Sequence, residues 1–390
     1  MMTATCRHRF LTPETGGPCL LLVMALAGFI LANSPWRSFY ALLAKPLGPV
    51  PLGDGLSPFC LPSVAELVTI GPMTLFFLTI SLELKKELTA GHLAEFRQCL
   101  LPCLSALGGV VVPAGLYALI AAPDPALRSG WAIPVATDAA FTLPVLLALG
   151  RRVSEGGRVW LMALAIFDDV LGIFIIALFY GGTPHAMPLF GTVILVGMMA
   201  CAGWRGVRCL WFYGLGGGLL WICLKEAGLH PTLAGVVVGL CLPTARYDGP
   251  SPLERVEHGL APWVTWGVLP LFGFVMVGVP LADTSLTSLD LRLIVAVVVG
   301  LVLGKTAGIF GMTWLAIRCR LASLPARTSW PMLFGLCLLC GLGFTVSLFM
   351  ASLAFPASGL LISSKIGIFL GSLMAVASGW FWLRCVVKET

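Results

Sequence analysis

Charged residues are scarce in this sequence. Asp, Glu, Lys and Arg make up 11% of its 390 residues, whereas a soluble globular domain carries roughly 25%. That shortage excludes a disordered chain, a coiled coil and an ordinary cytosolic enzyme. The 24 Lys and Arg residues are also scattered between apolar stretches instead of gathering in a patch, which excludes a nucleic-acid-binding protein.

Apolar stretches long enough to cross a membrane take up most of the chain. Apolar residues form 58% of the sequence, the mean hydropathy is +0.97, and a helix needs about 20 such residues to cross the hydrocarbon core. Cutting at charged or Pro/Gly-rich joints gives twelve candidate spans. They cover residues 14–35, 64–84, 99–121, 131–149, 157–180, 186–204, 208–224, 228–243, 259–280, 291–315, 331–354 and 361–384. The sequence therefore predicts an all-α polytopic membrane protein in which residues 1–390 form one integral-membrane domain.

The basic residues of the predicted loops indicate how the chain is oriented. Lys and Arg are enriched in the cytoplasmic loops of membrane proteins. With twelve spans, 17 of the 24 basic residues fall on the side that holds both termini, and Lys305 lies within a span. The six on the opposite side are Arg37, Lys45, Arg128, Lys225, Arg292 and Lys365. This asymmetry predicts that both termini are cytoplasmic.

Four ionisable residues stand out in the interior of the apolar spans: Asp138, Asp168, Asp169 and Lys305. Each costs at least ~2.5–3.5 kcal/mol at mid-membrane. One lysine can balance one carboxylate, so a purely structural pairing of helices would leave two acids uncompensated. Those acids must take up protons or bind a cation, and hard cations such as Na⁺ and Li⁺ prefer oxygen ligands. Because consecutive helical residues point about 100° apart, one acid of the Asp168-Asp169 pair can turn toward Lys305 while the other lines a cavity.

Proline and glycine weaken the helix in two spans. Pro134 and Pro144 bracket Asp138 in the fourth span, and Gly341 and Gly343 interrupt the eleventh. Interrupted helices in corresponding halves of a chain indicate the binding site of a secondary transporter.

Several other features are less specific. Cys337 and Cys340 have the CxxC spacing of a redox or zinc pair, but their apolar surroundings favour buried thiols. The stretch 53–55, Gly-Asp-Gly, fits a hairpin turn, although nearby prolines disfavour strands.

Charged residues near the ends of the second and ninth spans form either a solvated interface or a pH-sensitive cluster. Glycine pairs with GxxxG spacing predict close helix packing: Gly235 and Gly239, Gly304 and Gly308, Gly367 and Gly371.

Seven stretches carry a family resemblance. They are FFLTISLELKKEL (76–88), WAIPVATD (131–138), LMALAIFDD (161–169), HPTLAGV (230–236), EHGLAPW (257–263), GKTAGI (304–309) and CGLGFTVS (340–347). In this order they resemble the NhaA-type sodium/proton antiporters. The resemblance implies a pH-regulated transporter of the bacterial inner membrane that exports Na⁺ or Li⁺ and imports protons with net charge movement. It also implies twelve transmembrane helices with inverted repeats, whose interrupted fourth and eleventh helices cross.

The resemblance further implies roles for the charged residues. Asp169 is the central ion ligand, and Asp168 takes part in the exchange and can pair with Lys305, so Na⁺ is expected to bind Asp168 and Asp169. Asp138 is expected to balance the half-helix ends at the crossing, and Thr137 is a candidate oxygen ligand. No cofactor is expected, and the partners are the transported ions, the lipid bilayer and a second copy in a homodimer.

The family's pH sensing corresponds here to five residues at the end of the second span and directly before the ninth. They are Glu83, Lys86, Glu87, Glu257 and His258. Two departures bear on it: Ala261 replaces a second histidine, and the acid near the start of the second span is missing, with Glu66 about one turn away. With fewer titrating groups, we expect a shallower pH profile.

An intramembrane aspartyl protease is the alternative from another class, and a structural membrane protein is a third. A protease needs two carboxylates on separate helices that share one proton, usually with a Gly-x-Gly-Asp motif. That motif is absent from the sequence, and Lys305 would disturb a shared proton. We therefore expect a transporter and not an enzyme.

Overall fold

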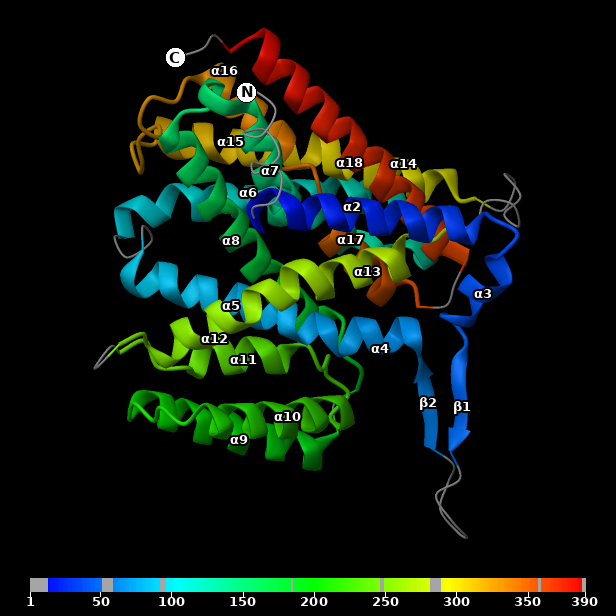
Figure 1. The fold of residues 1–390 in the computed structure, drawn as a ribbon. Helices are drawn as coiled ribbons and strands as arrows, with labels where there is room; N and C mark the ends of the chain where they lie inside the picture. The colour runs from blue at the N-terminus through cyan, green and yellow to red at the C-terminus, as the bar shows by residue number, and fades with distance from the viewer. Residues whose placement is uncertain are drawn as a thin grey trace, which may run out of the picture. The chain divides into compact units, whose positions relative to one another are not determined.

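The structure, a computed structural model, describes residues 13–50, 59–91, 96–183, 185–245, 249–280, 289–356 and 359–387. Helices dominate it (Figure 1). The chain divides into two compact units, of which unit 1 comprises residues 1–82 and 182–285 and unit 2 comprises residues 83–181 and 286–390. Helix α5 (Pro72–Ala90) contributes to both.

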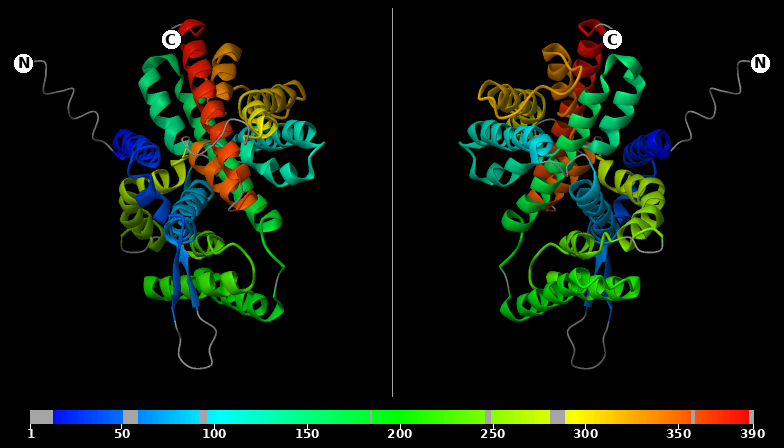
Figure 2. Two further views of the ribbon diagram at one scale, coloured as in Figure 1. Left: turned by 90° about the vertical axis from the view of Figure 1, so that its right-hand side faces the viewer. Right: turned by 90° about the vertical axis from the view of Figure 1, so that its left-hand side faces the viewer.

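Unit 1 holds the N-terminal helices and a central block of the chain. Its other elements are α2 (Pro13–Ala32), α3 (Arg37–Leu42), β1 (Pro46–Val50), β2 (Phe59–Ser63), α4 (Val64–Ile70), α9 (Ala186–Trp204), α10 (Leu210–Glu226), α11 (Leu233–Cys241), α12 (Pro252–Trp263), the π-helical turn η4 (Val264–Val268) and α13 (Leu269–Val277). Helices α9 and α10 lie side by side (Figures 1 and 2). Helix α2 packs closely on α13, since a Cβ at Gly28 would lie 2.2 Å from the carbonyl oxygen of Phe274.

The two strands of unit 1 form one antiparallel pair, with Pro46 opposite Ser63 and Val50 opposite Phe59. In a two-stranded sheet both strands are edges, so the missing N–H groups of prolines are tolerated. The stretch 53–55 lies outside the described residues. The all-α prediction is therefore correct except for this small sheet.

Unit 2 holds the remaining helices. They are α6 (Phe96–Ala121), the 3₁₀-helix η2 (Pro125–Val135), α7 (Ala139–Leu149), η3 (Gly150–Arg152), α8 (Glu155–Phe179), α14 (Leu291–Val299), the π-helical turn η7 (Gly300–Gly304), α15 (Lys305–Arg318), α16 (Trp330–Leu339), α17 (Phe344–Ala354) and α18 (Gly359–Cys385). Five of them begin at side-chain caps. At the starts of α8, α14 and α16, Ser154, Asp290 and Ser329 accept hydrogen bonds from first-turn amides at 3.1, 2.9 and 3.4 Å.

Each of the twelve predicted spans coincides with a helix or with helices in succession. Among the described residues, seven helices are long and apolar enough to cross a membrane, and nine if each of two bent pairs counts as one span. The other three predicted spans correspond to α2, α10 and α11. The chain is thus a multi-pass membrane protein with seven to nine such helices in its described part.

One charge assignment made from the sequence is wrong. Lys365 is counted there among the loop cations, but it lies inside α18 and is only 8% exposed. It lies in the second turn of α18, where neighbouring residues cover the side chain, so a basic residue near a helix end need not be solvated.

Glycines bring the helices of unit 2 into backbone contact. A Cβ at Gly308 would lie 2.1 Å from the carbonyl oxygen of Gly108, and one at Gly304 would lie 2.6 Å from Cα of Pro113. A Cβ at Gly367 would lie 3.2 Å from the carbonyl oxygen of Ile294. Helices α15 and α18 therefore approach α6 and α14 as closely as the GxxxG spacing predicts.

We expect Gly308→Ala to destabilise the protein by about 1–3 kcal/mol, because the new methyl group meets backbone that cannot move aside easily. Thermal unfolding in detergent measures this loss. Gly311→Ala is the matched control on the same helix, since a Cβ there meets nothing within 4 Å. Equal unfolding midpoints for the two variants would contradict the close α6–α15 contact.

Candidate functional site

Two helices of unit 2 are interrupted where the sequence predicts it. Between η2 and α7 the chain is extended from Ala136 to Asp138, and the two helices are bent by 44°. Between α16 and α17 the break covers residues 340–343, with a bend of 46°. The prediction of two interrupted helices is confirmed.

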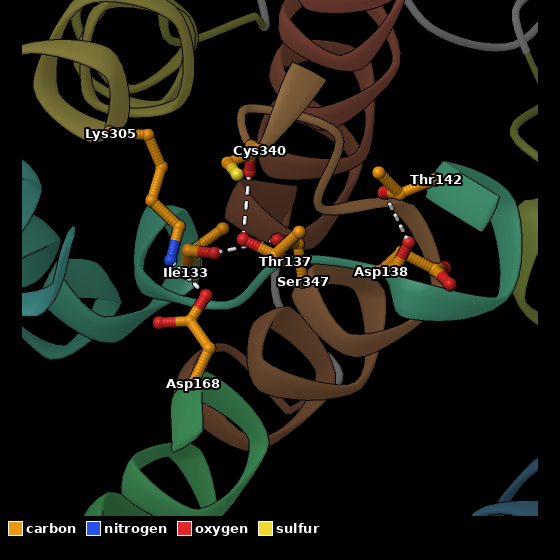
Figure 3. A network of polar contacts seen from close by, with 8 residues as sticks. All are labelled: Ile133, Thr137, Asp138, Thr142, Asp168, Lys305, Cys340 and Ser347. Atoms are coloured by element: carbon orange, nitrogen blue, oxygen red, sulfur yellow. Dashed lines mark hydrogen bonds and ion pairs between the residues drawn. The ribbon is translucent and has the colours of Figure 1, made fainter. Parts of the chain in front are cut away.

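Hydrogen bonds in opposite directions join the two breaks (Figure 3). The Thr137 hydroxyl, in the first break, donates to the carbonyl oxygen of Cys340 at 2.8 Å. The Ser347 hydroxyl, on α17, donates to the carbonyl oxygen of Ile133 at 2.7 Å. Carbonyl groups at helix ends lack partners within their own helix, so each broken segment satisfies one carbonyl of the other.

The Asp138 carboxylate connects the N-termini of α7 and α17. It accepts a hydrogen bond from the Phe141 amide at 3.4 Å, and it accepts two from Thr345, from the amide at 2.8 Å and the hydroxyl at 2.5 Å. Its own amide donates to the carbonyl oxygen of Leu342 at 2.7 Å. A helix N-terminus carries partial positive charge, so one buried carboxylate balances two such ends.

Lys305 and Asp168 form an ion pair in which both side chains are fully buried. Lys305 is the first residue of α15 and directly follows the π-helical turn η7, a feature frequent at functional sites. Gly109 on α6 lies beside the ammonium group, since a Cβ there would lie 3.5 Å from Nζ. Of the two adjacent acids, Asp168 is thus the one that turns toward Lys305, and the helical geometry allows only one of them to do so.

Asp169 is 8% exposed, and its Oδ1 is buried. Neither this atom nor Oδ1 of Asp168 has a hydrogen-bond partner among the described residues. The charged groups that act on Asp169 are Asp168, Asp138, Glu83 and Lys305. Together with Asp169 itself, four acids and one base give this part of unit 2 an excess of negative charge when all are ionised.

Thr137 lies beside the Asp168 carboxyl group. Because its hydroxyl hydrogen points to Cys340, its lone pairs remain able to accept a hydrogen bond or a cation. In the described part of the chain, no three His, Cys, Asp or Glu side chains are grouped to hold a metal ion.

The five residues predicted to sense pH lie on two helices. Glu83, Lys86 and Glu87 belong to α5 within unit 2, whereas Glu257 and His258 belong to α12 in unit 1. The five residues are thus divided between the two units, and the predicted pH-sensing cluster stays a prediction. Glu66 is exposed in the first turn of α4. Cys337 and Cys340, the two cysteines with CxxC spacing, are fully buried in an apolar cluster. This agrees with the buried thiols that their apolar surroundings in the sequence predict.

Two functional candidates, Thr345 and Ser347, receive no role from the sequence. Both are fully buried, and both bond to the other interrupted helix. Hydroxyl residues next to a glycine-rich break in an apolar span are the signal that could have identified them.

Buried acids and a lysine beside two broken helices, in a chain of apolar helices, define a multi-pass membrane transporter. Residues 8–383 match the family described as Na+/H+ antiporter 1, and the chain belongs to this family. It is 52% identical to the Na(+)/H(+) antiporter NhaA of Gluconobacter oxydans, with 97% of this chain and 93% of that protein covered. The antiporter of the same name from Gluconacetobacter diazotrophicus is 50% identical, with 97% and 96% covered.

A solved structure shares the fold at much lower sequence identity. The sodium proton antiporter MjNhaP1 from Methanocaldococcus jannaschii, at pH 8, superposes with a TM-score of 0.53 at 14% identity, covering 97% of this chain and 100% of that one. Because the family is one of transporters, the chain is not an enzyme, and the protease alternative is wrong. The geometry agrees, since Asp168 is paired with Lys305 and Asp138 with Thr345.

Proposed function

We propose that this protein exchanges Na⁺ or Li⁺ for protons at Asp168 and Asp169. The observation that carries the proposal is the pair of buried Oδ1 atoms without a hydrogen-bond partner among the described residues. A buried, ionised carboxylate oxygen without a donor is costly, and either a proton or a hard cation removes that cost. Protons and Na⁺ therefore compete for the same oxygens, and this competition couples their transport.

The buried ion pair supports a stepwise exchange. When Na⁺ binds between the two carboxylates, it competes with Lys305 for Asp168, and Thr137 can add a neutral oxygen ligand. When protons neutralise the acids, Na⁺ is released. Two protons per sodium, as the family resemblance implies, make the exchange electrogenic. Alternating access then delivers the ions to opposite sides of the membrane.

The finer architecture is part of the same proposal. All twelve predicted spans cross the bacterial inner membrane as a single antiporter domain, with both termini cytoplasmic, and the chain forms a homodimer within the bilayer. The interrupted helices cross, and inverted repeats relate them. The reciprocal bonds from Thr137 and Ser347 support this relation, because each break supplies the same kind of contact to the other. No cofactor takes part.

Purified protein in proteoliposomes tests this function. An imposed pH gradient should dissipate on addition of Na⁺ or Li⁺, and a membrane-potential dye should report net charge movement. No response to either ion, or the same response in protein-free liposomes, would refute Na⁺(Li⁺)/H⁺ exchange.

We further propose that Glu83, Lys86, Glu87, Glu257 and His258 sense pH on the cytoplasmic side. Moving one charge across 100 mV involves ~2.3 kcal/mol, so unregulated electrogenic exchange would keep loading the cytoplasm with protons. A sensor that stops transport at acidic pH prevents that.

Glu257→Gln should therefore shift the pH midpoint of activity and leave the maximal rate nearly unchanged, because it removes a charge from the sensor and not from the ion site. Na⁺-dependent proton flux measured from pH 6 to 9 gives both quantities. An unchanged profile, or loss of transport at every pH, would mean that these residues are only a solvated charged surface.

A further inference from the structure

Ser347 makes a contact that the exchange mechanism does not yet use. It is fully buried on α17, one turn beyond the break, and its hydroxyl donates to the carbonyl oxygen of Ile133 at 2.7 Å. Ile133 lies near the C-terminal end of η2, where carbonyl groups lose their helical partners. The break itself makes room for this hydroxyl, because a Cβ at Gly343 would lie 2.2 Å from Oγ of Ser347.

The residues that follow Ile133 belong to the ion site. Thr137 lies beside Asp168, and Asp138 joins the two helix N-termini. After η2 ends at Val135, the chain is extended from Ala136 to Asp138. The Ser347 bond holds the last turn of η2, directly before this extended segment, and the Thr137 bond to Cys340 holds the segment itself.

We propose that Ser347 is a positioning residue for cation binding. Its hydroxyl holds the stretch from Ile133 to Asp138 in register with α17, and so keeps Thr137 at the distance from Asp168 that a small cation needs. This inference rests on the proposed exchange at Asp168 and Asp169. It assigns to Ser347 an effect on cation affinity, whereas a residue that only stabilises the fold would leave affinity unchanged.

Ser347→Ala should raise the KM for Na⁺ about tenfold and change the maximal rate less than about twofold. Loss of a buried hydrogen bond leaves the Ile133 carbonyl without its partner, and a tenfold change corresponds to about 1.4 kcal/mol. Ser347→Thr keeps the hydroxyl and should restore a KM near that of the wild type. Ser347→Cys fills the space with a weak donor, so a raised KM in this variant assigns the effect to the hydrogen bond and not to packing.

Ser105→Ala is the matched control. Ser105 is fully buried in the same unit, and its hydroxyl bonds to Thr313 at 2.6 Å, away from both breaks. We expect a comparable fall in the thermal midpoint of this variant but an unchanged KM. If Ser347→Ala fails to fold, Ser347→Cys and Ser347→Thr still separate hydrogen bonding from packing.

Two results would overturn the inference. One is a wild-type KM in Ser347→Ala and Ser347→Cys, and the other is an equal rise of KM in Ser105→Ala. Failure of the proposed function is a separate outcome, because it appears as absent Na⁺-dependent proton flux in the wild-type protein.

Discussion

Asp169→Asn is expected to abolish Na⁺-dependent proton flux. The amide has nearly the same size as the carboxyl group, so packing is preserved, but it can neither ionise nor exchange a proton. Removing one charge from a buried electrostatic site costs at least about 3 kcal/mol, which corresponds to a fall of at least ~100-fold in cation affinity. Na⁺-induced dissipation of a pH gradient in proteoliposomes measures the loss.

Asp290→Asn is the control for Asp169→Asn. Asp290 caps α14 in the same unit, and Asn caps helices as well as Asp does, so near wild-type flux is expected. Robust Na⁺-dependent flux in Asp169→Asn would remove Asp169 from the ion site. Loss of flux in both variants would show that any neutralised acid in this unit suffices.

The sequence predicts the breaks and the ion pair because both depend on composition. Charges in apolar spans are costly wherever the helices pack, so Asp168 and Lys305 stand out among their apolar neighbours along the chain. Helical geometry then allows one acid of an adjacent pair to face the lysine, and Asp168 does so. Whether residues 46–63 form a hairpin cannot be decided from the sequence, because Gly-Asp-Gly favours a hairpin turn and the nearby prolines disfavour strands.

Contacts between the two breaks could not be predicted in the same way. Thr345 bonds to Asp138 across 207 positions of sequence, and Ser347 bonds to Ile133 across 214. A hydroxyl in an apolar helix usually bonds to a carbonyl of its own preceding turn, so sequence alone gives no reason to expect a distant partner. Lys365 could not be placed correctly for a different reason. A count of loop charges assumes that a basic residue near a helix end is solvated, whereas Lys365 is buried inside α18.

Lys305→Gln is expected to lower the free energy of unfolding by about 3–5 kcal/mol, because it leaves the Asp168 carboxylate buried without its counter-charge. Thermal unfolding in detergent at pH 8, where an unpaired carboxylate is most costly, measures the effect. Protonation of Asp168 relieves that cost, so the deficit should shrink as the pH is lowered toward 5.

The double variant Asp168→Asn/Lys305→Gln separates charge balance from packing. It removes both charges and keeps both side chains near their original size, so we expect it to regain most of the stability that Lys305→Gln loses, without regaining transport. A double variant no more stable than Lys305→Gln would mean that packing by the lysine, and not its charge, supports the fold.

Charge movement per Na⁺ in any residual exchange by Lys305→Gln identifies the second proton carrier. Electroneutral exchange assigns the second proton to Lys305, and electrogenic exchange assigns it to Asp168.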